Sequence, residues 1–197
     1  PLLFPLPRVL REPEPPPFLQ FTATGRSAVL VGGGGRARVR RNTIARARGT
    51  AVEVQAGGEC AMDENKVEGS EGYAVLFQGG GAGRVEGNMF ADGRRAAIAV
   101  SGGSSPQVVK NRIESSRATG VFVFDGGRGA FTQNTVARCR LAGVEVRDEG
   151  SFCVVEGNTV SDGQDGGIVV HSGARGLVQA NMVRDNAMAG ITVCTGA

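Results

Sequence analysis

The chain has 197 residues and a net charge of only +3, with 41% hydrophobic and 5% aromatic residues. This hydrophobic content excludes a disordered polar chain, and no apolar run approaches the roughly 18 residues of a membrane-spanning helix. Glycine occupies 32 positions, roughly twice its usual share, so the core must be built from small apolar side chains in repeated layers.

The first 20 residues differ in composition from the rest of the chain. Seven of the eight prolines lie between Pro1 and Pro17. Proline fixes the backbone and removes a hydrogen-bond donor, so we expect residues 1–20 to form an extended arm or linker and residues 21–197 to form one repeat domain. Because the chain starts at Pro1 rather than at Met, we expect it to be a fragment of a longer protein.

A repeat of 23 residues runs through the domain. An asparagine followed two positions later by an apolar residue recurs seven times at this interval, with one interval of 24. An alternating apolar pair begins ten residues after each asparagine, from Val52 and Val54 in the first repeat to Ile191 and Val193 in the last. The repeating asparagines are Asn42, Asn65, Asn88, Asn111, Asn134, Asn158 and Asn181.

Each repeat contains three short apolar segments of period two, which indicate three strands separated by turns. Repeats of this length stack as a solenoid. We therefore predict an all-β fold, a right-handed single-stranded parallel β-helix of about seven 23-residue coils. Val29 and Val31 precede Val52 and Val54 by 23 residues, which predicts a partial coil before the seven.

The asparagines predict an internal ladder. In stacked turns each carboxamide can donate a hydrogen bond to one neighbouring asparagine and accept one from the other, which satisfies buried polar groups and fixes the register. The extra residue falls between Val144 and Val155 and predicts a longer turn. Small residues that suit a tight corner precede each apolar pair: Ala51, Ala74, Ala97, Gly120, Gly143, Gly167 and Gly190.

The coils resemble the β-helix repeats of the CASH family, which comprises carbohydrate-binding proteins and sugar hydrolases. They are most similar to those of F-box proteins that carry a β-helix, whose coils alternate between a Ser-x-Pro and a Gly-x-Gly form. The resemblance rests on Ser105-Pro106 before Asn111, Gly127 and Gly129 before Asn134, and Gly173 and Gly176 before Asn181. It implies the substrate- or partner-binding domain of an F-box-like ubiquitin-ligase receptor or of a cytoskeletal adaptor.

Candidate binding residues occupy outward positions of the main strands. Phe122 and Phe124 alternate with Val121 and Val123, and alternation sends the phenylalanines outward if the valines point inward. An apolar strip with a polar rim is typical of a protein-binding face. The residues predicted to form this face are Phe122, Phe124, Glu145, Arg147 and His171.

An enzymatic alternative rests on Asp125 and Asp148. The two carboxylates share a column on adjacent coils, a spacing that suits a retaining glycosidase pair. The motifs of pectin hydrolases are absent, however, and every turn is short. We therefore expect a non-catalytic protein-interaction domain with a protein partner, and keep as the alternative a carbohydrate-active enzyme or carbohydrate-binding module of the pectate lyase or glycoside hydrolase type.

The cysteines indicate neither a metal site nor a cofactor. Cys60, Cys139, Cys153 and Cys194 contain no CxxC pair, and we expect all four to be reduced. No Asn-x-Ser/Thr sequence is present, which favours an intracellular protein, cytoplasmic or nuclear.

Arginines dominate the positive charge. Six of them cluster between Arg36 and Arg48, and Arg94, Arg117 and Arg140 share one turn column. No aromatic platform accompanies this basic ridge, so we do not expect nucleic acid as a partner. The last coil stops without a polar cap, which predicts end-to-end self-association there.

Overall fold

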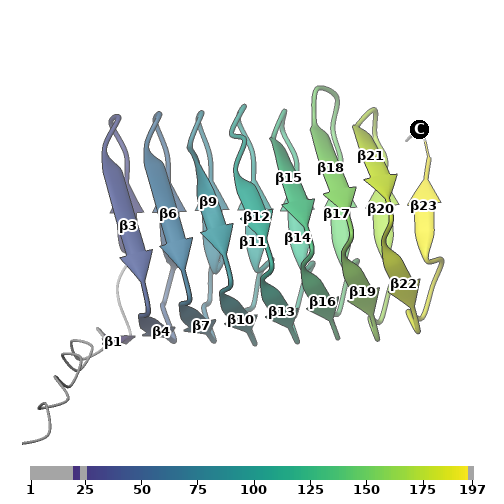
Figure 1. Cartoon of the computed structure of the whole chain (residues 1–197), viewed down its shortest axis with the longest axis horizontal. Coiled ribbons are helices and arrows are strands. Elements are labelled where there is room, and N and C mark those ends of the chain that lie inside the picture. The colour runs from purple at the N-terminus through teal and green to yellow at the C-terminus, as the bar shows by residue number, and fades with distance from the viewer. Residues whose placement is uncertain (1–19, 23–25, 195–197) are drawn as a thin grey trace, which may run out of the picture.

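The computed structural model describes residues 20–22 and 26–194 (Figure 1). They form 23 strands in three parallel sheets, here called sheets A, B and C, and each coil contributes one strand to each sheet. The predicted arm over residues 1–20 lies outside the described residues, apart from Gln20 at the start of the first strand. No helix in the described part of the chain is long and apolar enough to cross a membrane.

The strands are short and stack in coil order. Sheet A contains β1 (Gln20–Thr22), β4 (Thr43–Ala45), β7 (Lys66–Glu68), β10 (Met89–Ala91), β13 (Arg112–Glu114), β16 (Thr135–Ala137), β19 (Thr159–Ser161) and β22 (Met182–Arg184). Sheet B contains β2 (Ser27–Val31), β5 (Thr50–Val54), β8 (Val75–Phe77), β11 (Ile98–Val100), β14 (Val121–Val123), β17 (Val144–Val146), β20 (Ile168–Val170) and β23 (Ile191–Val193). Sheet C contains β3 (Arg36–Arg40), β6 (Glu59–Asp63), β9 (Ala82–Glu86), β12 (Gln107–Val109), β15 (Arg128–Thr132), β18 (Phe152–Glu156) and β21 (Arg175–Gln179).

The register between coils follows the sequence repeat. Phe90 of β10 pairs with Val67 of β7 on one side and with Ile113 of β13 on the other, 23 residues away in each direction. The predicted all-β parallel solenoid of about seven 23-residue coils is therefore confirmed. The partial coil is also present, because β2 pairs with β5 through Val29 and Val52.

The core lies inside the solenoid and is filled by one layer of side chains per coil. Alternation in β14 buries Val121 and Val123 to 1% and 0% exposure. The apolar residue three positions before each ladder asparagine also points inward, as Val108 and Phe131 show with 0% and 1% exposure. Small apolar side chains therefore fill most of the core, and Phe77, Phe90 and Phe131 are its fully buried rings.

The asparagine ladder joins the coils from Asn42 to Asn181. The Nδ2 of Asn88 donates to the Oδ1 of Asn111 at 3.0 Å, and the Nδ2 of Asn111 donates to the Oδ1 of Asn134 at 3.0 Å. The backbone N–H of Asn111 donates to the same Oδ1 at 2.9 Å, and its Nδ2 also donates to the carbonyl oxygen of Val85 at 2.8 Å. Each buried carboxamide is thus satisfied by the coils on both sides, which confirms the ladder.

The ladder sits at a sharp bend between sheets C and A. The residue before each of several ladder asparagines adopts a left-handed conformation, with φ of 55° at Glu64, 54° at Lys110 and 56° at Gln133. A non-glycine residue in that conformation costs about 1–2 kcal/mol. The ladder hydrogen bonds offset this cost and hold the bend.

The corner before sheet B needs its small residues. Ala51 is fully buried there, and in the later coils glycine takes its place. A Cβ on Gly143 would lie 2.3 Å from Cγ1 of Val160, and one on Gly120 would lie 2.5 Å from Cγ1 of Val136. The side chains of Val136 and Val160 occupy the space next to these corners, so only glycine fits at positions 120 and 143.

The extra residue lies in the turn between β17 and β18, as predicted, and makes that turn the tallest of its row (Figure 1). The ladder continues across it, because the Nδ2 of Asn134 still donates to the Oδ1 of Asn158 at 3.0 Å.

The four cysteines are free thiols. Cys60, Cys139 and Cys153 are buried and Cys194 is exposed. Burial raises the pKa of the Cys139 thiol to about 11 and that of Cys153 to about 12, and burial together with the nearby Asp63 raises the pKa of Cys60 to about 11. The three buried thiols are therefore protonated at neutral pH and serve as small core residues.

The ladder predicts position-dependent losses of stability. Asn111→Ala leaves the backbone N–H of Asn88 and the carbonyl oxygen of Val85 without their partners, and each such buried group costs about 1–3 kcal/mol. Asn181→Ala should cost less, because Asn181 is only half-buried. Urea unfolding of both variants measures the difference, and equal, negligible losses at both positions would refute a stabilising ladder.

The thiols predict a split in chemical reactivity. At pH 8 the native protein should expose one fast-reacting thiol, Cys194, while the other three react only after denaturation, because their raised pKa values keep the thiolate scarce until about pH 11. Titration with a coloured disulfide reagent counts both classes. Cys194→Ser is the control and should remove the fast class, and any fast thiol that remains in this variant would contradict the burial assignment.

Candidate functional site

The outer face of sheet B carries the predicted aromatic pair. Phe122 projects from β14 between the inward Val121 and Val123, and Phe124 follows two positions later on the same face. The two rings stack with centroids 4.5 Å apart and planes inclined by 15°. Both side chains are half-buried, so the outward placement predicted from alternation is present, with part of each ring covered by its partner.

The next coil places a cation on this pair. Arg147 follows β17, and its guanidinium carbon lies 4.9 Å from the centre of the Phe122 ring. Its Nε also lies 3.6 Å from Oδ2 of Asp148. A guanidinium over an aromatic face is attracted by the ring quadrupole, so Arg147 and the two rings form one surface feature.

Glu145 contacts residues of the two neighbouring coils beside the rings of Phe122 and Phe124. It pairs in register with Phe122. Its Oε1 lies 3.3 Å from Nε2 of His171, and its Oε2 accepts a hydrogen bond from the hydroxyl of Thr119 at 3.2 Å. The other ring nitrogen of His171 lies 2.9 Å from the hydroxyl of Ser172. These contacts fix the polar rim of the aromatic pair.

A hollow of about 360 Å³ opens next to Phe122. Arg95 lies in its wall with its guanidinium carbon 4.7 Å from the ring centre of Tyr73, and Leu141 is 45% exposed. The lining residues are Tyr73, Arg94, Arg95, Ala96, Ala118, Thr119, Phe122, Leu141, Glu145 and Arg147. Two arginine–aromatic contacts therefore flank one hollow.

Sequence reasoning missed Tyr73, Arg95 and Leu141. They lie in the turns that lead into sheet B rather than in its strands, so the strand columns do not contain them. The signal that could have identified this position is Tyr73, the single tyrosine of the chain, two residues before β8.

The outward column that contains Phe122 is not accessible along its whole length. Leu76 and Ala99 share the Phe122 column, but their exposure is only 9% and 0%. Phe122, Phe124 and the half-buried Val169 are the accessible apolar residues in this part of the face. The accessible centre of the surface therefore coincides with the aromatic pair.

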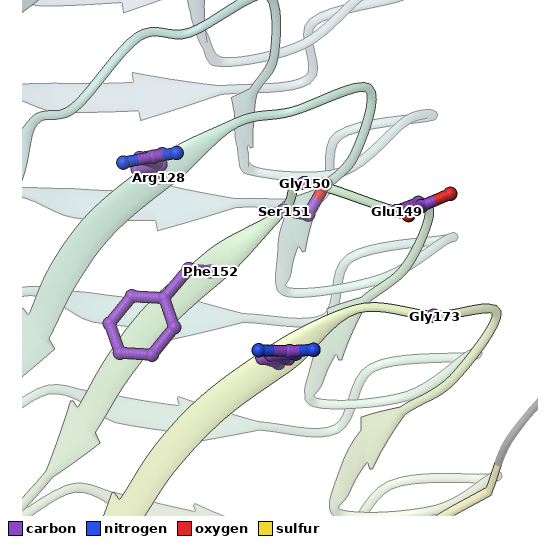
Figure 2. A pocket seen from close by; sticks show the side chains of 7 residues that line it. Arg128, Glu149, Gly150, Ser151, Phe152 and Gly173 are labelled. Atoms are coloured by element: carbon purple, nitrogen blue, oxygen red, sulfur yellow. The ribbon is translucent and has the colours of Figure 1, made fainter.

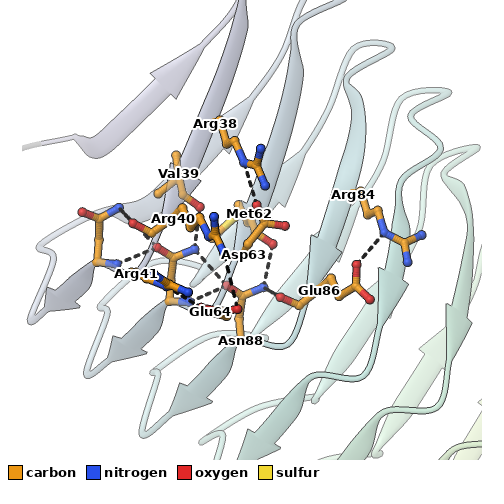
Figure 3. A network of polar contacts seen from close by, with 12 residues as sticks. Arg38, Val39, Arg40, Arg41, Met62, Asp63, Glu64, Arg84, Glu86 and Asn88 are labelled. Carbon is orange, nitrogen blue, oxygen red and sulfur yellow. Dashed lines mark hydrogen bonds and ion pairs between the residues drawn. The ribbon is translucent and has the colours of Figure 1, made fainter. Parts of the chain in front are cut away.

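The predicted basic ridge divides into two parts. In the first coil, Arg38 pairs with Asp63 at 2.9 Å and Arg41 with Glu64 at 2.6 Å (Figure 3). By contrast, Arg94, Arg117 and Arg140 form exposed rungs of one turn column and make no ion pair within the described residues. Unpaired positive charge thus lies beside the hollow, whereas Arg36, Arg38, Arg40 and Arg41 of the first coil are paired with acids of the next coil.

Asp125 and Asp148 lie in turns between sheets B and C. The backbone N–H of Asp125 donates to Oδ2 of Asp148 at 3.2 Å, and both residues adopt left-handed conformations, with φ of 49° and 73°. The Asp148 carboxylate therefore caps a neighbouring turn. Neither side chain lines the hollow beside Phe122.

Within the described ranges, no group of three histidine, cysteine, aspartate or glutamate side chains is arranged to hold a metal ion.

The family model for the right-handed β-helix region matches residues 51–197. The match covers more than half of the chain, and the chain belongs to this family. No curated protein and no solved structure matches the chain significantly. The family match establishes a right-handed β-helix domain.

The aromatic pair predicts a specific pattern of stability. Replacing both Phe122 and Phe124 with serine should destabilise the fold by about 1–2 kcal/mol, because it removes a ring stack and a cation–π contact from a half-exposed site. Phe131→Ser should cost at least about 3–5 kcal/mol, because it empties a fully buried site. Thermal and urea unfolding compare the two, and equal losses would show that the inward and outward assignment is wrong.

Proposed function

We propose that this β-helix is a non-catalytic interaction domain and that the outer face of sheet B binds a protein partner. The observation that carries the proposal is the half-exposed Phe122–Phe124 stack, held under Arg147 beside an open hollow. Aromatic residues and arginine are enriched at the centres of protein interfaces, and a few such residues supply most of the binding energy.

The charges next to the hollow favour a partner of one kind. Arg94 and Arg95 line it, and Arg117 and Arg140 continue the row on the next two coils. Glu145 is the acid of the lining and is already engaged by His171 and Thr119. Electrostatic complementarity therefore favours a partner segment that combines acidic side chains with an aromatic or aliphatic anchor.

Such a domain suits the partner-binding part of an F-box-like ubiquitin-ligase receptor or of a cytoskeletal adaptor, acting in the cytoplasm or nucleus. The carbohydrate-active alternative has less support, because the Asp148 carboxylate is engaged by a turn and the two aspartates share no hollow. Turnover of polyuronides by the protein, abolished in Asp125→Asn and Asp148→Asn variants, would establish that alternative instead.

A peptide-display experiment tests the proposal with the protein as the target. Libraries panned on the wild-type chain should enrich peptides that combine acidic and aromatic residues. The selected peptides should lose at least tenfold in affinity for the Phe122→Ala/Arg147→Ala variant, because both sides of the arginine–aromatic contact are removed.

The matched control is Leu30→Ala. Leu30 is 58% exposed and occupies the same outward column of sheet B at the far end, so this change should leave the affinity unaltered. If selected peptides bind the double variant as well as the wild type, the aromatic pair is not the binding face.

A further inference from the structure

A second surface, on sheet C, has a different composition. Phe152 begins β18, and the strand register places Arg128 of β15 on one side of it and Arg175 of β21 on the other. The next residue, Cys153, points inward with 0% exposure, whereas Phe152 points outward and is 42% exposed. Two arginines therefore flank one exposed phenylalanine on three adjacent coils.

These residues line a hollow of about 600 Å³. Its far wall is the turn made longer by the extra residue, which contains Glu149, Gly150 and Ser151 (Figure 2). Gly173 contributes to the lining from the next coil, and its φ of 78° is a left-handed conformation that favours glycine. The insertion thus creates a concave site on an otherwise regular solenoid.

The two arginines are free to bind a ligand. At the other end of the same column Arg36 pairs with Glu59 on the next coil at 3.0 Å. Arg128 and Arg175 have Phe152, rather than an acidic residue, as their neighbour in this column. Neither arginine makes an ion pair within residues 26–194. Figure 2 shows the Glu149 carboxylate turned away from Phe152, so the positive charge beside the ring stays uncompensated.

We propose that this hollow binds a phosphate monoester whose organic part carries a ring. Each guanidinium presents a planar fork that can donate two hydrogen bonds. A phosphate monoester offers three acceptor oxygens and a charge of about −1.5 to −2, which two forks can share. A carboxylate has two oxygens and a single charge, which one fork already satisfies.

The dimensions and the apolar floor agree with this ligand. The strands of Arg128 and Arg175 are two spacings apart, about 9.6 Å, so the two long side chains can approach one phosphate from opposite sides. The exposed Phe152 ring offers a surface on which a ligand ring can pack in an offset or edge-to-face arrangement. A phosphotyrosine side chain and a nucleoside monophosphate both present this combination.

The test uses phenyl phosphate as the probe and the full 197-residue chain as the protein. Titration at a fixed ionic strength of about 0.15 M, followed by NMR of the backbone amides and arginine Nε–H groups, reports binding at single residues. Saturable shifts should centre on Arg128, Phe152 and Arg175. Benzoate, with the same ring and a carboxylate, should bind at least tenfold more weakly.

Variants assign the contacts. Arg128→Ala and Arg175→Ala should each weaken phenyl phosphate binding at least tenfold, and Arg128→Lys should also weaken it, because lysine keeps the charge but lacks the fork. Phe152→Ser should weaken phenyl phosphate binding severalfold and leave inorganic phosphate unaffected. Arg36→Ala is the matched control from the same column and should change neither affinity. The melting temperatures of the variants, measured alongside, should be unchanged because these positions are exposed.

Three outcomes would overturn the proposal: no saturable shift with phenyl phosphate, equal binding of benzoate, or an equal loss in Arg36→Ala. Two further arms distinguish the sources of the phosphoryl group. Tighter binding of a short phosphotyrosine peptide than of adenosine monophosphate identifies a protein ligand, and the reverse order identifies a free nucleotide.

Discussion

The asparagine ladder is the interaction on which the rest of the structure depends. Each ladder carboxamide forms hydrogen bonds with the coils on both sides of it. A shift of one coil relative to its neighbours would therefore leave buried polar groups without partners. The left-handed bends before the asparagines are stable only while these bonds hold. Because the ladder fixes the register, every outward position becomes a straight row of side chains on the surface. The binding properties of the molecule are then decided by which residues follow one another in each row.

The rows of outward side chains on this solenoid differ in whether their charged residues are paired with residues of opposite charge. On sheet C, Arg36 meets Glu59 in the first coils, whereas Arg128 and Arg175 meet Phe152 near the other end. On sheet B, Phe122 is followed by Glu145, whose carboxylate is held by neighbouring coils. Rows with alternating signs neutralise themselves and contribute little to binding or stability at such exposed positions. The Arg128–Phe152–Arg175 row, in which an aromatic residue takes the place of the acid, leaves its cations without an acidic partner. On sheet B the unpaired cations lie instead in the turn column of Arg94, Arg117 and Arg140, beside the aromatic pair.

The sequence was sufficient for the parts of the structure that obey the repeat. The 23-residue period predicted the coils, the asparagine column predicted the ladder, and alternation with Val121 and Val123 predicted that Phe122 points outward. The contacts that could not be predicted depend on side-chain conformations between coils, such as Arg147 over Phe122, or on turns outside the strand columns, such as Tyr73 with Arg95. The Arg128–Phe152–Arg175 row could have been found from sequence, but only by carrying the register through the one interval of 24 residues.

That interval shows where a solenoid can change its surface without losing its core. The extra residue is absorbed in the turn between β17 and β18, and the ladder bond across it, from Asn134 to Asn158, has the same 3.0 Å length as the bond from Asn111 to Asn134. Insertions in turns cost little because loop-closure entropy rises slowly with length, while an insertion in a strand would reverse every inward and outward position after it. Short turns also leave the faces of the sheets open rather than enclosed. A surface of this shape suits the capture of a partner segment or a small anion on flat rows of side chains better than a reaction that must exclude water.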